Sequence, residues 1–192
     1  MSFKQRIIIG ISGASGIIYG IRLLQTLNQL HIETHLVMTE SAKLTLSLET
    51  DYKLKDVEAM ASVVHNTKNI GATISSGSFK TLGMVVAPCS IRSLSEIAYG
   101  ATTSLLSRAA DVVLKERRRL VLMVRETPLH SGHLKAMTQA CDNGAILMPP
   151  VPAFYAKPNS VEDIVNHTVG RCLDLFDLDT DLVKRWNGTA AD

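Results

Sequence analysis

The sequence has little cysteine, no marked excess of charge of one sign and no long hydrophobic run, and each absence excludes a class of protein. Its three cysteines, Cys89, Cys141 and Cys172, lie far apart and fit neither a zinc-ligand spacing nor a secreted disulfide framework. The 20 basic and 18 acidic residues leave a net charge of +2, which is too balanced for a nucleic-acid or membrane-surface partner. No apolar stretch approaches the roughly 20 residues of a membrane span. We therefore expect a cytoplasmic protein with no membrane or nucleic-acid partner.

Apolar periodicity predicts that strands and helices alternate along the chain. Strand-like segments cover 6–11, 32–38, 82–88, 120–126 and 145–150, and helix-like segments cover 16–30, 41–49, 103–118, 130–142 and 160–176. Ser160 is placed to cap the last helix, and the tail from about 177 to 192 is less regular. This alternation predicts an α/β protein with a Rossmann-like, doubly wound parallel sheet. The length, 192 residues, is that of a single domain.

Ligands of such sheets bind beyond the carboxyl ends of the strands, where the strand order reverses. The first strand ends at "SGASG" (12–16), where Ser12, Ser15 and the amides of the next helix suit a phosphate, although a tight turn without a ligand would read the same way. The spacing Gly10-x-x-Gly13-x-x-Gly16 differs from the G-x-G-x-x-G fingerprint of dinucleotide sites.

Two further strand ends carry polar side chains. Thr39 follows the second strand, and "CSIRS" (89–93) follows the third and opens a helix. The hydroxyls and amides of this segment suit an anion or the edge of a flavin ring. The alternative, without a ligand, is that Ser90 only caps the helix.

Cysteine and histidine chemistry receives weaker support from the sequence. Cys89 at a helix start is a candidate for a lowered thiol pKa, but no histidine base is placed beside it. His130 and His133 form an H-x-x-H pair without a third ligand or a suitably spaced acid, so we expect no metal.

The remaining polar and aromatic candidates have ordinary structural explanations when taken singly. Arg125-Glu126 is typical of a buried ion pair, Glu49 and Lys115 of solvated surfaces, and Tyr155 and Trp186 of packing. Arg171 differs, because it lies near the apolar stripe of the last helix and its head group can point to a specific partner.

Several motifs in order along the chain together resemble the flavin prenyltransferase family of the UbiX type. The motifs are "GISGASGIIYGIRLL", "ETHLVMT", "LSLETD", "ISSGSF", "APCSIRSL", "RAADVVLKERR", "VRETPLH" and "MPPVPAFY", followed by Arg185, Trp186, Asn187 and Gly188. The resemblance runs from about residue 6 to residue 188 and implies a single flavoprotein-type domain over 1–192.

This resemblance implies an activity that composition alone does not indicate. Members of the family transfer a dimethylallyl group from dimethylallyl phosphate to N5 and C6 of reduced FMN, without a metal. The prenylated FMN passes to a UbiD-type decarboxylase, often in ubiquinone biosynthesis. The resemblance also implies a homo-oligomer, a dodecamer, with active sites built across subunit contacts.

The resemblance also assigns roles to residues of this sequence. It implies FMN binding by Gly13, Ala14, Ser15, Thr39, Ser90, Ile91, Arg92, Ser93 and Arg125; binding of the prenyl phosphate by Lys115, Tyr155 and Arg171; and catalytic positions at Ser15, Glu49, Glu126 and Trp186. Thr39 stands where the family often has serine, and Arg92 where lysine is common.

The chemistry suits these residue types. Basic and phenolic groups stabilise the charge of a departing phosphate, and an aromatic face such as that of Trp186 favours a cationic prenyl fragment. Glu49 or Glu126 suits the base that ring closure needs, and Ser15 suits either a proton relay at N5 or a phosphate contact.

Three other functions are weighed against this one. An FMN-dependent decarboxylase of the cysteine-decarboxylase type shares the broad fold, but it needs a catalytic histidine after the first helix and a "PxMN" segment where this chain has "PCSI". The glycine spacing and the lack of a second domain disfavour an NAD-dependent oxidoreductase. A non-catalytic flavin carrier has no need of Lys115, Tyr155 and Arg171 together.

Overall fold

A computed structural model describes residues 5–186 and 188 of the chain. Six parallel strands form one sheet in the order β3-β2-β1-β4-β5-β6 among these residues. The strands are β1 (Arg6–Ile11), β2 (Glu33–Met38), β3 (Val63–His65), β4 (Gly83–Cys89), β5 (Arg119–Val124) and β6 (Ile146–Leu147). The strand order reverses between β1 and β4, so the doubly wound Rossmann-like fold is confirmed and a ligand site is expected at their carboxyl ends.

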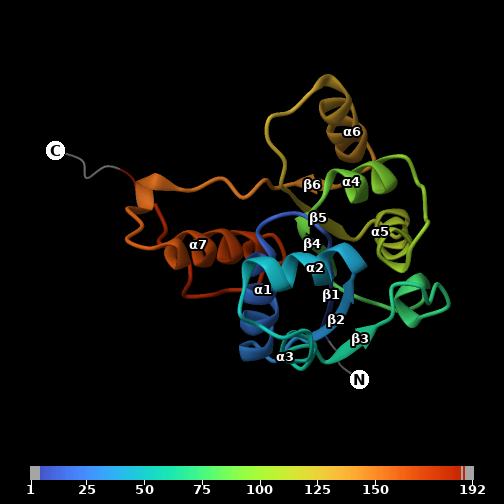
Figure 1. Ribbon diagram of the computed structural model, residues 1–192, viewed down its shortest axis with the longest axis horizontal. Helices are drawn as coiled ribbons and strands as arrows, with labels where there is room; N and C mark the ends of the chain where they lie inside the picture. The colour runs from blue at the N-terminus through green and yellow to red at the C-terminus, as the bar shows by residue number, and fades with distance from the viewer. Residues whose placement is uncertain (1–4, 187, 189–192) are drawn as a thin grey trace.

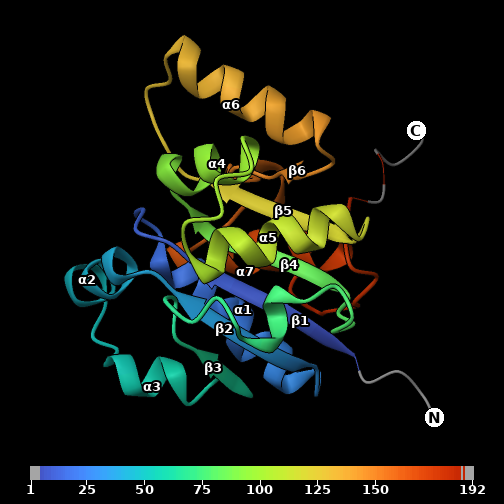
Figure 2. The same cartoon turned by 90° about the vertical axis from the view of Figure 1, so that its right-hand side faces the viewer.

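Helices cover both faces of the sheet (Figures 1 and 2). The described helices are α1 (Ile17–Gln29), α2 (Glu40–Glu49), α3 (Leu54–Glu58), α4 (Ile91–Ala98), α5 (Leu105–Lys115), α6 (Ser131–Asp142) and α7 (Val161–Asp174), with short 3₁₀ turns η1 (Thr73–Ser75) and η2 (Phe154–Ala156). Helices α1 and α7 pack on one face, and α4, α5 and α6 pack on the other.

The isoleucine run of β1 holds the two layers together. Ile7 and Ile9 are fully buried against the α1 and α7 side, whereas Ile8 is buried against the α5 side. Burial of one such side chain stabilises the fold by about 1.5–3 kcal/mol. A continuous apolar run, rather than an alternating one, is therefore required in this central strand.

The sequence predicted five strands, and the structure has a sixth, β3. This edge strand has only three residues, and Val63 and Val64 are exposed, so it lacks the buried apolar run that marks the central strands. The strand predicted over 145–150 is also shorter, since only Ile146 and Leu147 pair with β5.

The segment of residues 148–160, called the arm below, leaves the carboxyl end of β6 and runs away from the sheet to η2 (Figure 1). The C-terminal segment before residue 187 returns beside it, and Lys184 Nζ donates to the Ala156 carbonyl at 3.5 Å. Asn187 and residues 189–192 of the predicted irregular tail lie outside the described part. No helix within the described residues has the length and apolar character needed to cross a membrane.

Candidate active site

Ser12 joins the carboxyl ends of β1 and β4, where the strand order reverses. Its hydroxyl donates to the Pro88 carbonyl at 2.9 Å and accepts from the Ser90 amide at 2.8 Å, and the residue is fully buried. The expectation that Ser12 faces a phosphate is therefore wrong, because its single hydroxyl proton is donated to the Pro88 carbonyl and the side chain is fully buried. Ser12 instead fixes the turn that carries Ser90 to Ser93.

The turn between β1 and α1 depends on two glycines. Gly13 lies so close to α2 that an added Cβ would overlap the Ser41 side chain. Gly16 has φ 96° and ψ 32°, a left-handed conformation that glycine adopts without strain, and it forms the N-cap of α1. The predicted FMN-binding residues Gly13, Ala14 and Ser15 thus form a tight backbone turn beside the start of α2.

The Glu49 carboxylate occupies the amides that open α1. Its Oε2 accepts from the Gly16 amide at 2.8 Å and from the Ile17 amide at 3.1 Å. Burial alone raises the pKa of Glu49, but the Ser15 hydroxyl, these two amides and the charge of Arg125 lower it by more, so the net pKa is below the ordinary value. The expected free amides at this helix start are therefore taken by a side chain of the same protein.

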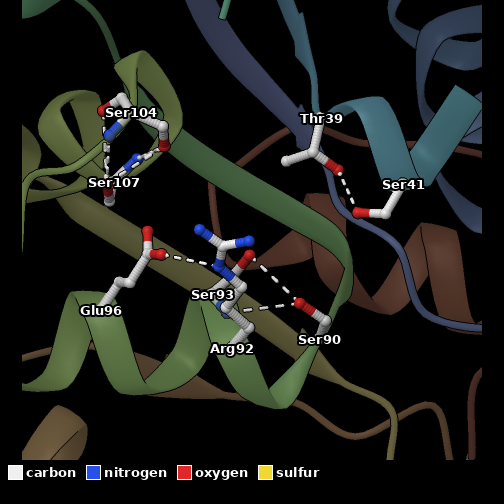
Figure 3. A network of polar contacts seen from close by, with 8 residues as sticks. All are labelled: Thr39, Ser41, Ser90, Arg92, Ser93, Glu96, Ser104 and Ser107. Atoms are coloured by element: carbon white, nitrogen blue, oxygen red, sulfur yellow. Dashed lines mark hydrogen bonds and ion pairs between the residues drawn. The ribbon is translucent and has the colours of Figure 1, made fainter.

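Three other helices begin near the carboxyl ends of the strands with hydroxyl caps (Figure 3). Thr39 Oγ1 caps α2 and lies 3.1 Å from Ser41 Oγ, and Ser90 Oγ caps α4 by accepting from the Ser93 amide at 3.2 Å. Ser104 caps α5 in the same way. The prediction that Ser90 caps a helix is confirmed.

The starts of α4 and α5 carry neutral caps, whereas the start of α1 is bonded to the Glu49 carboxylate. Helices α4 and α5 have no acidic residue in their first turns, and the Ser93 and Ser107 amides there are bonded to neutral hydroxyl caps. Arg92, beside the Ser90 cap, has an exposed side chain that pairs with Glu96 at 3.0 Å. Hydroxyl groups, helix starts without an acidic first turn and a basic side chain together fit the phosphate and polar ring edge of FMN.

Arg125 and Glu126 follow β5 at the same edge of the sheet. Both side chains are exposed and no ion pair joins them, so the buried pair that this dipeptide typically indicates does not form here. The Arg125 amide donates to the Cys89 carbonyl at 3.1 Å, and the charge of the Arg125 guanidinium helps to lower the pKa of Glu49. Arg125 is therefore free to contact a ligand at the carboxyl ends of β4 and β5.

The Cys89 thiol does not have the lowered pKa that its place before a helix suggested. Its side chain lies in the core, and burial raises the pKa to about 12. A thiolate nucleophile is thus disfavoured at this position. Among the described residues, no group of three or more histidine, cysteine or acidic side chains is arranged to hold a metal ion.

A second group of candidates lies where the arm meets α7. The Tyr155 ring in η2 packs edge-on against His167 of α7, with ring centroids 5.7 Å apart, and against Trp186, with centroids 6.1 Å apart. Tyr155 is 53% exposed and Trp186 is 64% exposed. Both side chains therefore present open ring surface.

Arg171 follows His167 by one helical turn. Its Nη1 donates to Asp174 Oδ2 at 2.6 Å, and Asp174 also accepts from Arg185 at 2.9 and 3.1 Å. These contacts, led by the hydrogen bond from Arg185, lower the pKa of Asp174. No role was predicted from the sequence for His167, Asp174 or Arg185, although the i, i+4 and i, i+3 spacing from Arg171 places the first two on one helix face.

Tyr19 of α1 interacts with residues of α7 and of the strand ends. Burial raises the pKa of its hydroxyl, opposed by a hydrogen bond with Thr168 of α7 and by the charge of Arg125. Tyr19 therefore interacts both with α7 and with Arg125 at the strand ends.

Lys115 is not part of this second group. It ends α5 and pairs with Glu116. Helices α5 and α7 lie on opposite faces of the sheet (Figure 2). A single chain therefore does not bring Lys115 together with Tyr155 and Arg171.

The fold and the polar strand ends are those expected of a flavoprotein. The family model described as Flavoprotein matches residues 1–173, which form the sheet and all but the last residue of α7. Curated relatives narrow this class. Flavin prenyltransferase UbiX from Escherichia coli (strain K12) is 62% identical over 187 residues, covering 96% of this chain and 99% of that protein. The chain belongs to the flavin prenyltransferase family of the UbiX type.

Solved structures agree with this family. AnUbiX (PadA1), in complex with FMN and dimethylallyl pyrophosphate, has a TM-score of 0.95 at 50% identity, covering 97% of this chain and 99% of that chain. A dodecameric FMN-dependent UbiX-like decarboxylase from Escherichia coli O157:H7 has a TM-score of 0.94 at 49% identity, covering 96% and 100%. The cysteine decarboxylase SpaF is only 14% identical with a TM-score of 0.63, so its likeness extends to the fold alone.

Proposed function

We propose that this flavin prenyltransferase transfers a dimethylallyl group from dimethylallyl phosphate to N5 and C6 of reduced FMN, and that a UbiD-type decarboxylase receives the product. The observation that carries the proposal is the set of hydroxyl-capped helix starts at the β1–β4 switch point, together with the 50% identical relative that binds FMN and dimethylallyl pyrophosphate. We further infer that residues 1–192 act as one flavin-binding domain.

The flavin would lie across the carboxyl ends of β1, β4 and β5. Gly13–Ser15 form its close backbone wall, and Thr39 and Ser90–Ser93 offer hydroxyl and amide donors. Arg125, exposed at the end of β5, supplies a positive charge near the ring. Reduced FMN, when bound, supplies the nucleophilic N5 and C6.

Phosphate release from the donor requires positive charge and hydrogen-bond donors around the leaving oxygens. Tyr155 and Arg171 come from one chain, and a second copy of the chain would supply Lys115 from the end of its α5. Arg171 suits a bidentate phosphate contact, for which it would exchange its bond with Asp174. The exposed ring of Trp186 offers the cationic prenyl fragment an aromatic face.

Proton transfer at ring closure falls to a carboxylate at the strand ends. Glu49 is ionised at neutral pH, as carboxylates ordinarily are, so it is able to accept a proton, and the Ser15 hydroxyl is bonded to it as a relay. Glu126 is a second candidate, exposed beside Arg125.

We infer a homo-oligomer, and a dodecamer by likeness to the 49% identical structure described as dodecameric. The exposed apolar side chains of the arm, Val151 and Phe154, and of α2, Leu44 and Leu48, support such contacts. We also infer a cytoplasmic location, which the three free thiols of Cys89, Cys141 and Cys172 support, since a reducing compartment keeps thiols unpaired.

The test pairs FMN binding with donor use. FMN affinity is measured by fluorescence titration, and prenylated FMN formation is measured anaerobically with reduced FMN and dimethylallyl phosphate. Because each charged phosphate contact contributes about 1.5–3 kcal/mol, we expect Arg171→Ala and Lys115→Ala to lower donor kcat/KM about ten- to a hundredfold, with FMN affinity unchanged.

Arg117→Ala is the matched control, because Arg117 lies in the same basic run as Lys115 and is assigned no role in the site. Wild-type protein that forms no prenylated FMN would refute the proposed reaction. Equal loss of FMN and donor binding in Arg171→Ala would move that residue to the flavin site or to a structural role.

A further inference from the structure

His167 stands beside Tyr155 without a part in the proposed chemistry. Its Nε2 lies 3.2 Å from the Tyr155 hydroxyl oxygen, and the two rings meet edge-on at an interplanar angle of 83°. His167 is only 9% exposed, whereas Tyr155 is open to solvent. The buried histidine thus contacts the Tyr155 hydroxyl from the protein side, while the tyrosine ring is accessible to solvent.

The Tyr155 hydroxyl has one proton, for which His167 and the phosphate of a bound donor would compete. Phosphate oxygens only accept hydrogen bonds, so a phosphate can be bound by the phenol only if the phenol proton points toward it. If Nε2 of His167 accepted that proton, the phenol would present lone pairs to the phosphate. If Nε2 carries a hydrogen and donates it to the phenol oxygen, the phenol proton is free for the phosphate.

The electrostatic surroundings of His167 favour a neutral ring. Burial first, and then the charge of Arg171, lower its pKa, while Asp174 opposes the shift. A neutral imidazole carries one hydrogen, on either Nδ1 or Nε2. The nitrogen that carries this hydrogen therefore decides whether Nε2 donates to the Tyr155 oxygen or accepts its proton.

We propose that His167 is a positioning residue for the prenyl donor: its Nε2–H donates to the Tyr155 oxygen, holds the ring against α7 and leaves the hydroxyl proton directed at the donor phosphate. This inference rests on the proposed role of Tyr155 in donor binding. His167 touches neither substrate, and its effect passes entirely through the Tyr155 hydroxyl.

A double-mutant cycle tests that dependence. The variants are His167→Phe, which keeps a ring of similar size but no N–H, His167→Gln, whose amide is able to donate, Tyr155→Phe, and the double variant His167→Phe with Tyr155→Phe. Donor kcat/KM is measured at saturating reduced FMN, with FMN affinity and urea unfolding measured for each protein.

We expect His167→Phe to lower donor kcat/KM about three- to tenfold, the range for one neutral hydrogen bond, with FMN affinity unchanged. His167→Gln should recover most of this loss. In the Tyr155→Phe background, His167→Phe should change donor kcat/KM by less than about twofold, because the hydroxyl on which it acts is already absent.

An equal loss from His167→Phe in both backgrounds would overturn the proposal, since it would show a general packing effect. If His167→Phe does not fold, the comparison is made with His167→Gln and with His167→Met, which fills the site without an N–H. If Tyr155→Phe lowers donor use but no His167 variant does, only the inference about His167 is wrong. If Tyr155→Phe has no effect, the donor role of Tyr155 and the inference built on it are both refuted.

Discussion

Ser12→Ala tests whether the β1–β4 junction holds the flavin site in place. The Ser12 hydroxyl is fully buried and makes two hydrogen bonds, one to the Pro88 carbonyl and one from the Ser90 amide. Alanine removes both. The Pro88 carbonyl keeps its bond from the Ser12 amide at 3.2 Å, but the Ser90 amide loses its partner at the entry to α4.

The magnitude follows from these contacts. A neutral hydrogen bond contributes about 0.5–1.5 kcal/mol, and a buried donor left without a partner costs about 1–3 kcal/mol. We therefore expect the free energy of unfolding to fall by about 2–3 kcal/mol. FMN affinity should fall about tenfold, equivalent to about 1.4 kcal/mol, if flavin binding must then order the Ser90 turn.

Urea unfolding and FMN fluorescence titration measure the two effects. Ser47→Ala is the control, because Ser47 is an exposed serine of α2 whose hydroxyl donates to the Leu44 carbonyl at 2.8 Å, a local bond within one helix. Its stability should stay within about 0.5 kcal/mol of wild type. The reasoning fails if Ser12→Ala matches this control in both assays.

Three further changes probe the turn, the carboxylate and the edge of the sheet. Gly13→Ala should weaken FMN binding, because the added Cβ would overlap α2 and displace the turn. Gly71→Ala is the control, because its added Cβ would meet its nearest atom at an ordinary 3.5 Å. Equal FMN affinities of the two variants by titration would show that this turn does not contact the flavin. Glu49→Gln should keep FMN binding and slow single-turnover formation of prenylated FMN, and unchanged rates would exclude it as the base. Burial, and then the neighbouring His35, lower the pKa of His65 in the folded chain. The stability that His65 contributes is therefore present above the ordinary histidine pKa and is lost as the pH falls below that value. Urea unfolding from about pH 8 to about pH 5 should show that loss, and a profile just as steep in His65→Gln would contradict it.

Segments with a long, consistent apolar pattern were predictable from the sequence. The first strand was predicted over residues 6–11 and is observed at Arg6–Ile11, because continuous burial on both faces leaves a strong signal. The last helix begins after Ser160, whose hydroxyl accepts from the Asp163 amide, as its capping pattern predicted. β3 was missed because an exposed three-residue edge strand is fixed by its neighbour β2 and not by its own pattern.

The candidate site was predictable only as far as the topology rule reaches. The carboxyl ends of the strands led directly to Thr39, Ser90 and Arg125. The contact of Glu49 with the start of α1 joins residues 33 positions apart, so no local pattern indicates it. The burial of Cys89 also depends on the helices packed over β4, and it reversed the expected direction of the pKa shift.

The position of Glu49 bears on how the flavin is oriented. A carboxylate already offsets the positive end of α1, whereas α4 and α5 start with neutral serine caps and no acidic residue. A phosphate gains most where a helix dipole is not yet offset, so the FMN phosphate is expected toward those starts. The flavin ring would then lie nearer α1, within reach of Glu49 and Ser15, where the proposed reaction needs a proton acceptor for ring closure. On this argument, one carboxylate both directs the phosphate away from α1 and serves the reacting end of the flavin.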